Sequence, residues 1–528
     1  MKPAGIILVL LLALLSMVIS CRQDQLTATE AVTLMDSLEH KLEWLDYRIN
    51  RETWQLYTRG EADSLQFYRG LYDYVISDER TFRTLQQAKP LLDTEIDQRR
   101  RELLFATLVQ SRAESRPDIS RLRDSLAQVD INYRAEFEGK QQTAGALYRI
   151  YRTDKNPIRR EIAYRAWCSV GLELADGLER LVRLRNQAAR RLGYNNYLAL
   201  VFKLQGLKQS DYLSLLNRLD SLSLEPYQAI LQGVEETLSP DDIEIWDLAY
   251  SYAGINAQVD AHFPADSQMP YIRSSLEKLG FNLDKLPIWF DLQPRPGKSQ
   301  LAYAFPMKSP YDIRVLANQT DGLYSTRVLL HEIGHAVHFA HVAQERPLFN
   351  NALSPGWIEG TAQIAAALCD EEDWLRDCAG MSPELISRHL EAKRQQDIIY
   401  LRTTLMRLYF EYRAYVNPER DLNRLYWDLF EQYLMLPRHD ELKPWAAIIH
   451  YTTHPVYLHN YLLGDILAAQ TVAYLHENYG SIAGNPAVNS FLIQNYYRFG
   501  GRYPWRELLE RGTGETLNPQ YLIDHLTG

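Results

Sequence analysis

The chain has few cysteines, little glycine and no excess of positive charge. Four cysteines in 528 residues are too few for a disulfide-stabilised scaffold. Lys and Arg number 57 against 67 Asp and Glu, a formal net charge of −10, which argues against nucleic acid as the main partner. A phosphate-binding loop is also missing, because Leu292 stands where a loop ending in Gly297–Lys298–Ser299 would need glycine. Nucleotide binding is therefore excluded.

The N-terminus carries an apolar run from Ile6 to Ile19, interrupted only by Ser16. This run is too short for a stable spanning helix and is typical of a secretory signal. It ends in a sequence that resembles the bacterial lipobox, with Cys21 at the cleavage point. We therefore expect a lipoprotein signal peptide at residues 1–20 and a lipid on Cys21. The lipid would anchor the protein to a membrane without spanning it, in the periplasm or at the cell surface. The alternative is a plain signal peptide with an incidental cysteine.

Three cysteines remain after this segment, Cys168, Cys369 and Cys378. Cys369 and Cys378 are close enough in sequence to pair in an oxidising compartment. Two buried thiols are the alternative.

The pattern of apolar residues predicts a mostly helical fold. Residues 160–194 carry apolar side chains at three- and four-residue spacing without proline, and Gly193 follows a basic last turn as a helix stop should. Between 283 and 318, three short runs separated by turn residues read as strands: PIWFDL, LAYAF and DIRVLAN. No clean domain boundary follows residue 25, so residues 21–528 are expected to form a single catalytic domain. A small β-sheet would lie directly before the histidine-rich stretch.

That stretch reads RVLLHEIGHAVHFAHV at 327–342. His331 and His335 are four residues apart, which on a helix places both rings on one face, within reach of one ion. Glu332 follows the first histidine, where a carboxylate reaches the attacking water rather than the metal. This is the HExxH arrangement of zinc peptidases. His338 and His341 are expected to be helix-surface residues or neighbours of the two ligands.

A catalytic zinc ion needs a third protein ligand, and Glu359 is the candidate. It stands 24 residues after His335 in an otherwise apolar helix, where a carboxylate is costly to bury unless it is paired or bound to a metal. Ser354 and Pro355 predict the start of this helix, with a capping hydroxyl and a proline in the first turn.

These residues resemble the angiotensin-converting enzyme family of zinc peptidases, which is related to the thimet oligopeptidase family. The likeness is carried by HEIGHAVH, by PGWIEG around Glu359, and by segments 165–194, 454–470 and 503–526. The resemblance implies two helical lobes around a deep substrate groove. It also implies zinc-dependent hydrolysis of peptides, with release of C-terminal dipeptides.

The resemblance further implies a role for each residue of the site. His331, His335 and Glu359 would bind Zn²⁺, and Glu332 would be the general base that later protonates the leaving amine. A tyrosine would donate to the oxyanion of the tetrahedral intermediate. We prefer Tyr461 for that role.

Other residues would hold the substrate. Tyr457 would bind it, although the roles of Tyr457 and Tyr461 are open to reversal. His450 or His454 would assist the tyrosine or bind the substrate carbonyl. The strand around Ala302 and Ala304 would pair with the extended peptide.

Three departures from the family pattern bear on specificity. The lysine that grips the substrate's C-terminal carboxylate is replaced by Ile448. The chloride-binding arginine has no match at His459 or Asn460, and an acidic residue one turn after the glutamate ligand is replaced by Gln363. An endo-acting oligopeptidase is therefore a second hypothesis. A non-catalytic, lipid-anchored peptide-binding protein is a third, although the intact Glu332 argues against it.

Overall fold

The computed structural model describes residues 26–238 and 243–528, and this part of the chain is mostly helical, as the sequence predicts. The expected signal peptide at residues 1–20 and Cys21 lie outside the described residues. Among the described helices, none combines the length and the apolarity needed to cross a bilayer.

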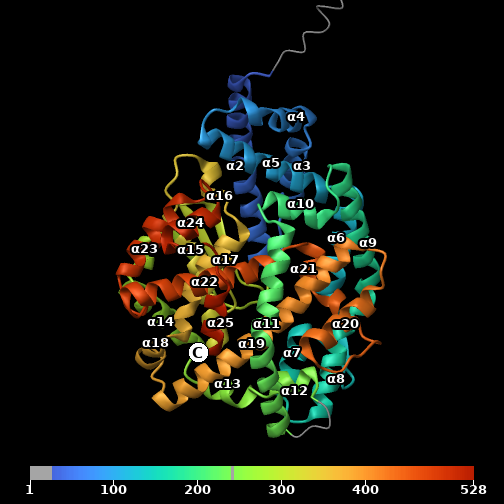
Figure 1. Cartoon of the computed structure of the whole chain (residues 1–528), viewed down its shortest axis with the longest axis vertical. Helices are drawn as coiled ribbons and strands as arrows, with labels where there is room; N and C mark the ends of the chain where they lie inside the picture. The colour runs from blue at the N-terminus through green and yellow to red at the C-terminus, as the bar shows by residue number, and fades with distance from the viewer. Residues whose placement is uncertain (1–25, 239–242) are drawn as a thin grey trace, which may run out of the picture.

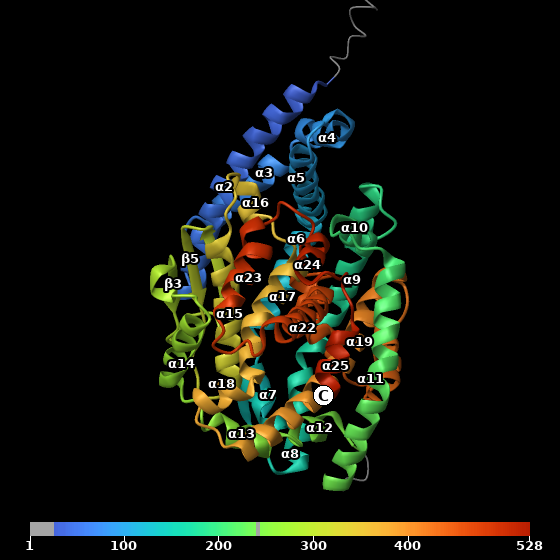
Figure 2. The same ribbon diagram turned by 60° about the vertical axis from the view of Figure 1, so that its left-hand side comes forward.

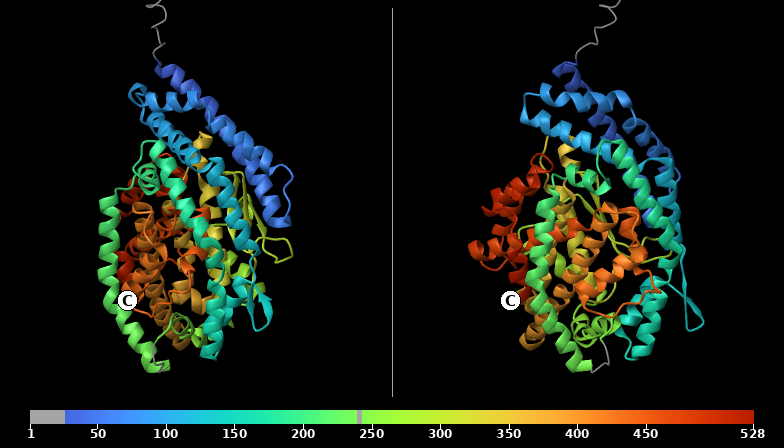
Figure 3. Two further views of the ribbon diagram at one scale, coloured as in Figure 1. Left: turned by 90° about the vertical axis from the view of Figure 1, so that its right-hand side faces the viewer. Right: turned by 45° about the vertical axis from the view of Figure 1, so that its right-hand side comes forward.

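The N-terminal helices form the upper end of the molecule (Figure 1). They are α2 (Ala28–Arg59), α3 (Leu65–Ile76), α4 (Glu79–Ala88) and α5 (Glu95–Glu114). The longest, α2, begins with a capping box in which Thr27 and Glu30 bond each other's backbone amides. Its C-terminal half runs down to the small sheet, where the rings of Tyr57 and Tyr303 lie 5.0 Å apart. Figure 3 shows this helix crossing the outside of the other N-terminal helices.

The next region is helical except for one hairpin that the sequence pattern did not reveal. Its helices are α6 (Pro117–Asn132), α7 (Ala144–Thr153), α8 (Pro157–Cys168), α9 (Val170–Arg191), α10 (Tyr197–Leu204), α11 (Gln209–Leu238), α12 (Ile245–Tyr250), α13 (Ala253–Asp260) and α14 (Ala265–Lys278). The hairpin pairs β1 (Ala135–Phe137) with β2 (Lys140–Gln142). Its turn places Glu138 and Gly139 at φ 52° and 73°, which is the geometry of a tight hairpin turn.

The stretch at 160–194 also differs from one continuous helix, because α8 ends and α9 begins around Ser169. Gly193 does act as the predicted stop, with φ +89° just after the basic end of α9.

The three predicted strands are confirmed. They are β3 (Ile288–Asp291), β4 (Tyr303–Lys308) and β5 (Asp312–Leu316), in the order β3-β5-β4. Strand β5 is parallel to β3 and antiparallel to β4. The buried Lys298 ammonium fixes the connection from β3 to β4 by donating to the backbone oxygens of Asp291, Gln293 and Ala317.

The C-terminal half contains the helices that build the candidate site. They are α15 (Leu323–His341), α16 (Pro347–Asn351), α17 (Pro355–Ala366), α18 (Glu372–Asp377), α19 (Pro383–Val416), α20 (Leu422–Leu434), α21 (Ile449–Thr453), α22 (His459–Tyr479), α23 (Ala487–Asn495), α24 (Trp505–Thr513) and α25 (Gln520–Thr527). Helices α15, α17 and α22 lie next to one another near the middle of the molecule (Figure 2).

Two large hydrophobic cores meet at α22. One contains residues of α6 to α12, α19 to α21 and α25, and the other contains residues of β3, β5, α13 to α15, α17, α18, α23 and α24. Leu462 and Ile466 of α22 belong to the first core, whereas Leu463 and Leu467 belong to the second. Alternate faces of one helix thus join the two halves.

The cysteines of the described chain are free thiols. Cys369 is buried, and burial raises its pKa to about 12. Cys378 lies 3.6 Å from the Ser275 hydroxyl instead of pairing with Cys369. Both cysteines of this pair are therefore free thiols, but only Cys369 is buried, whereas Cys378 is half-buried.

Candidate metal centre

The two histidines of the HExxH stretch meet on one face of α15. Their Nε2 atoms lie 3.1 Å apart, with the ring planes at 86°. This convergence is what a spacing of four residues on a helix predicts. Both nitrogens therefore point toward one position beside the helix.

Glu359 approaches the same position from α17. Its Oε2 atom is 3.3 Å from Nε2 of His331 and 3.8 Å from Nε2 of His335. Pro355 stands in the first turn of α17, as predicted, but the Ser354 hydroxyl does not cap it. The capping bond is therefore a wrong prediction, whereas the helix start is right.

The three donors fit a metal ion of zinc's size. Tetrahedral bonds of about 2.0–2.2 Å would separate the ligand atoms by about 3.3–3.6 Å. The observed separations of 3.1, 3.3 and 3.8 Å bracket that range. Two imidazoles and a carboxylate are also the donor types that zinc accepts in open sites. Within the described part of the chain, these three side chains form a group in which one donor atom of each lies within 4.8 Å of the other two.

Glycines allow α15, α17 and α22 to come this close. A Cβ atom on Gly334 would lie 2.9 Å from Cβ of Ala365 and 3.0 Å from the backbone of Ala362. A Cβ atom on Gly464 would lie 2.8 Å from the backbone nitrogen of Gly360. A side chain at either glycine would push α17, and with it Glu359, away from the histidines.

Glu332 has an environment suited to a general base. Burial raises the pKa of its carboxyl to about 7, even though the His331 charge and the backbone amide of Ala304 act to lower it. A base is most effective when its pKa lies near the working pH. A cation held by the three donors would act in the opposite direction to burial and lower this pKa.

The two histidines of the cluster are not equivalent. Burial lowers the pKa of His335, and His331 lowers it further. Burial also acts to lower the pKa of His331, but its hydrogen bond with Glu359 and the charge of Glu332 outweigh burial and raise it. His335 therefore presents a free lone pair more readily than His331 does.

Both candidate tyrosines border the site, but they contact different partners. The hydroxyl of Tyr457 donates to Oε1 of Glu359 at 2.9 Å. The hydroxyl of Tyr461 lies 3.4 Å from Nε2 of His450. Burial raises the pKa of each hydroxyl, so both stay protonated and can donate. His454 is further out, with its ring 5.9 Å from that of Tyr457.

The edge strand β4 borders the site near Glu332. Ala304 lies in β4 and Ala302 directly precedes it. Strand β4 pairs with β5 on one side, and no described strand pairs with its other edge. Pro306 lacks an amide hydrogen and its oxygen accepts from the Asn50 side chain of α2 at 3.4 Å, so β4 offers no further pairing at that residue.

Sequence reasoning missed the partner of Gln363. The amide of Gln363 donates to Oδ1 of Asp465 at 3.0 Å, and the Gln363 side chain acts to raise the pKa of His331. Tyr461 and Asp465 stand four residues apart on α22, a spacing in the sequence that could have placed both on one face. Asp465 therefore joins the list of candidate residues.

His338 and His341 stay outside the donor cluster. His338 is fully buried, with Nδ1 2.9 Å from the Thr361 hydroxyl and its ring stacked 4.6 Å from Tyr497. A surface position for His338 is therefore wrong, and it is a neighbour of the site within the core. His341 is half-buried and contacts the backbone oxygen of Val337.

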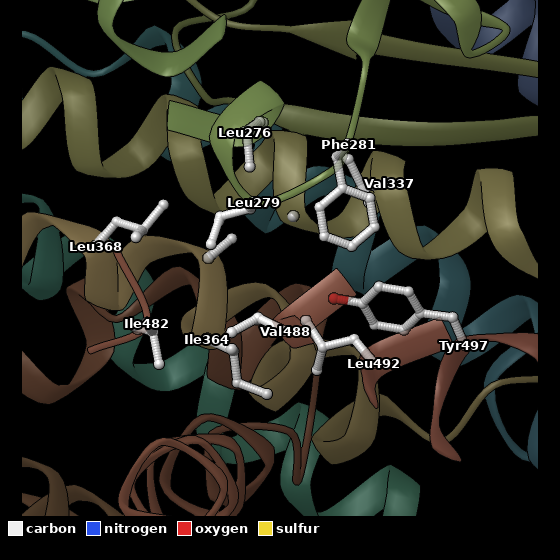
Figure 4. Close-up of a pocket in the computed structure, with 12 residues that line it drawn as sticks. Leu276, Leu279, Phe281, Val337, Ile364, Leu368, Ile482, Val488, Leu492 and Tyr497 are labelled. Carbon is white, nitrogen blue, oxygen red and sulfur yellow. The ribbon is translucent and has the colours of Figure 1, made fainter. Parts of the chain in front are cut away.

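A small cavity lies on the apolar side of these helices (Figure 4). It measures about 20 Å³, and its walls include Phe281, Val337, Ile364, Leu492 and Tyr497. That volume holds about one water molecule, and an apolar cavity of this kind stays dry. None of the candidate catalytic or metal-binding residues lines it, so it is not a substrate site.

A scan against protein-family models gives no match, and a search of curated proteins finds no similar sequence. The assignment of function consequently depends on the residues of the site.

Proposed function

We propose that the chain is a zinc-dependent peptidase of the angiotensin-converting enzyme type that hydrolyses oligopeptides and releases C-terminal dipeptides. The observation that carries the proposal is the convergence of His331, His335 and Glu359 with Glu332 next to them. A zinc ion held by these three donors would polarise the scissile carbonyl and acidify the attacking water.

The protein's own groups would perform the proton transfers. Glu332 would accept a proton from the attacking water and deliver it to the leaving amine. Tyr461 would donate a hydrogen bond to the developing oxyanion, since Tyr457 already donates to Glu359. His450, 3.4 Å from the Tyr461 hydroxyl, would orient that hydroxyl.

The substrate backbone would add to the free edge of β4 at Ala302 and Ala304, with His454 and Tyr457 contacting it further along. The amide of Ala304 lies near the Glu332 carboxylate. A peptide paired there would consequently pass the general base.

A deep groove between two helical lobes is part of the proposal. Support comes from side chains that are exposed yet surrounded by protein. Tyr324 exposes 79% of its surface, yet burial and then Tyr148 of α7 raise its pKa. Tyr400 exposes 50%, yet burial and then Asp465 raise its pKa to about 12. In the proposed groove these residues would line the walls, and the pKa of Tyr461 responds to Tyr400 nearby.

An unpaired arginine favours recognition of a free C-terminus over internal cleavage. Arg407 of α19 has no ion-pair partner among the described residues, and its Nε atom is buried without a hydrogen bond. The hydroxyl of Tyr451 donates to the Arg407 backbone oxygen at 2.9 Å, and the Arg407 charge is near enough to His450 to help lower the pKa of that imidazole, after burial and His454. We propose that it binds the substrate's terminal carboxylate in place of the lysine that Ile448 replaces.

The location is proposed from the sequence. A lipid on Cys21 would tether the protein outside the cytoplasm, in the periplasm or at the cell surface. Helix α2 begins at one end of the long axis (Figure 1), so the tether would attach at that end.

The test uses a soluble form that begins after Cys21, incubated with unstructured peptides and read by mass spectrometry. We expect C-terminal dipeptides from the wild type, and a loss of activity of about 10²–10⁴-fold in Glu332→Gln with zinc still bound. Internal fragments would favour the endo-acting oligopeptidase instead. A zinc-loaded wild type that cuts no peptide would leave the peptide-binding protein as the better account.

A further inference from the structure

A strained residue directly precedes Tyr457. Val456 has φ +54°, in the left-handed region that β-branched residues rarely enter. Its side chain is buried, and it lies in the short connection between α21 and α22. Such a conformation persists only where the surrounding structure holds it.

The group that holds it is a buried carboxyl. The backbone amide of Val456 donates to Oε1 of Glu411 at 2.6 Å. Glu411 lies within α19, exposes 5% of its surface and has no ion pair within 4.0 Å among the described residues. Burying a carboxyl group costs folding free energy unless the group is hydrogen-bonded. Within the described part of the chain, the Glu411 side chain makes one hydrogen bond, the one to Val456.

The backbone on the other side of Tyr457 is fixed as well. Its oxygen accepts from the backbone amide of Asn460 at 2.8 Å and from the Asn460 side chain at 3.0 Å. With its backbone held before and after, Tyr457 directs its hydroxyl to Oε1 of Glu359 at 2.9 Å. That bond leaves Oε2 of Glu359 to face the two histidines.

We propose that Glu411 is a positioning residue of the metal centre, which holds Val456 in the left-handed conformation and thereby orients Tyr457 on Glu359. The inference rests on the proposed zinc site. Glu411 touches neither the ligands nor a substrate, and it acts through the backbone of Val456.

The experiment measures the zinc affinity of the metal-free protein by competition with a chelator, with kcat and KM recorded alongside. Glu411→Met fills a similar volume without an acceptor, and Glu411→Asp keeps the charge but withdraws the oxygen from Val456. We expect each to lose about 10–100-fold in zinc affinity, and we expect a loss of the same size for Tyr457→Phe. Glu411→Gln keeps an acceptor oxygen and should stay within about threefold of the wild type.

The decisive variant relieves the strain. Glycine adopts φ +54° without steric cost, so adding Val456→Gly to Glu411→Asp or Glu411→Met should restore most of the zinc affinity. Val456→Ala keeps a Cβ atom and is the matched control, which should restore little. Circular dichroism checks that each variant folds, and if Glu411→Met does not, the Glu411→Asp series is read.

The outcomes separate the two proposals. Zinc affinity that is unchanged in the folded Glu411 variants while Tyr457→Phe weakens it overturns the positioning role. Equal rescue by glycine and alanine also overturns it. A wild type that binds zinc and cuts no peptide defeats the proposed function alone, whereas a wild type that binds no zinc defeats both.

Discussion

The side-chain amide of Gln363 donates to the carboxylate of Asp465, which stands 102 residues after it in the chain, and the same glutamine side chain acts to raise the pKa of His331. The family resemblance implies an acidic residue at position 363, one turn after the glutamate ligand. Here the acid stands on α22 instead of α17, and the amide of Gln363 bridges the gap. An outer hydrogen bond of this kind fixes the orientation of a metal-binding histidine.

Removal of the Asp465 carboxylate should weaken zinc binding. We expect Asp465→Leu to lower zinc affinity by about tenfold, because Gln363 loses its acceptor and is free to rotate away from His331. Asp465→Asn keeps an acceptor oxygen and should lose less. Chelator competition on the purified variants measures both values, and equal affinity for Asp465→Leu and the wild type would contradict the bridge.

A charge swap tests the same link from the other side. Gln363→Glu places a second carboxylate beside Asp465, and we expect it to weaken zinc binding through repulsion between like charges. In the Asp465→Asn background that repulsion is absent, so Gln363→Glu should be tolerated. A double-mutant cycle on zinc affinity gives the coupling between the two positions.

Gly334→Ala should destabilise the fold by about 1–3 kcal/mol, because its methyl group would meet Ala365 and the backbone of Ala362. Urea unfolding measures the change. The matched control is Gly233→Ala in α11, where no atom lies within 4 Å of the added Cβ. The control should be stabilised by about 0.5–1 kcal/mol through helix propensity. A tolerated Gly334→Ala would show that α15 and α17 are packed less closely than the structure places them.

Arg407→Gln should raise KM for peptides with a free C-terminus by about tenfold or more, since a charge-assisted bond to the carboxylate is lost. Peptides with an amidated C-terminus should be poor substrates of the wild type and should respond little to the variant. Arg388→Gln, on an exposed part of the same helix, controls for the loss of one positive charge. Equal cleavage of free and amidated peptides by the wild type would rule out Arg407 as the anchor.

Glu411→Gln should change how stability depends on pH. Burial raises the pKa of Glu411 to about 7 in the folded protein, against about 4.3 in the unfolded chain. The folded state therefore binds this proton more tightly, and the wild type loses stability as the pH rises from about 4.3 to 7. Glutamine has no titrating proton. Relative to the wild type, the free energy of unfolding of the variant should therefore rise by about 2 kcal/mol between pH 4.5 and pH 8.

Denaturant unfolding at the two pH values measures that difference. Glu391→Gln, at an exposed position of the same helix, removes the same formal charge and serves as the control. A Glu411→Gln difference that does not depend on pH would mean that the carboxyl is better solvated than its buried position implies.

Local sequence determined several features of this protein. The spacing of His331 and His335 dictated that both rings share a face, because helix periodicity fixes it within one turn. The strands at 283–318 and the start of the helix that carries Glu359 were also predictable, because turn residues and proline act on the neighbouring backbone. The hairpin at 135–142 escaped because three-residue strands are too short to show an alternating pattern.

The tertiary structure alone decided how the site is completed. Tyr457 reaches Glu359, and Gln363 reaches Asp465, only because glycines let α15, α17 and α22 pack backbone to backbone. The strain at Val456 and its bond to Glu411 arise from the meeting of α19 with the α21–α22 connection. The spacing of residues in the sequence predicts which of them a helix presents on one face. Which partner each one meets depends on long-range packing, which local periodicity does not encode.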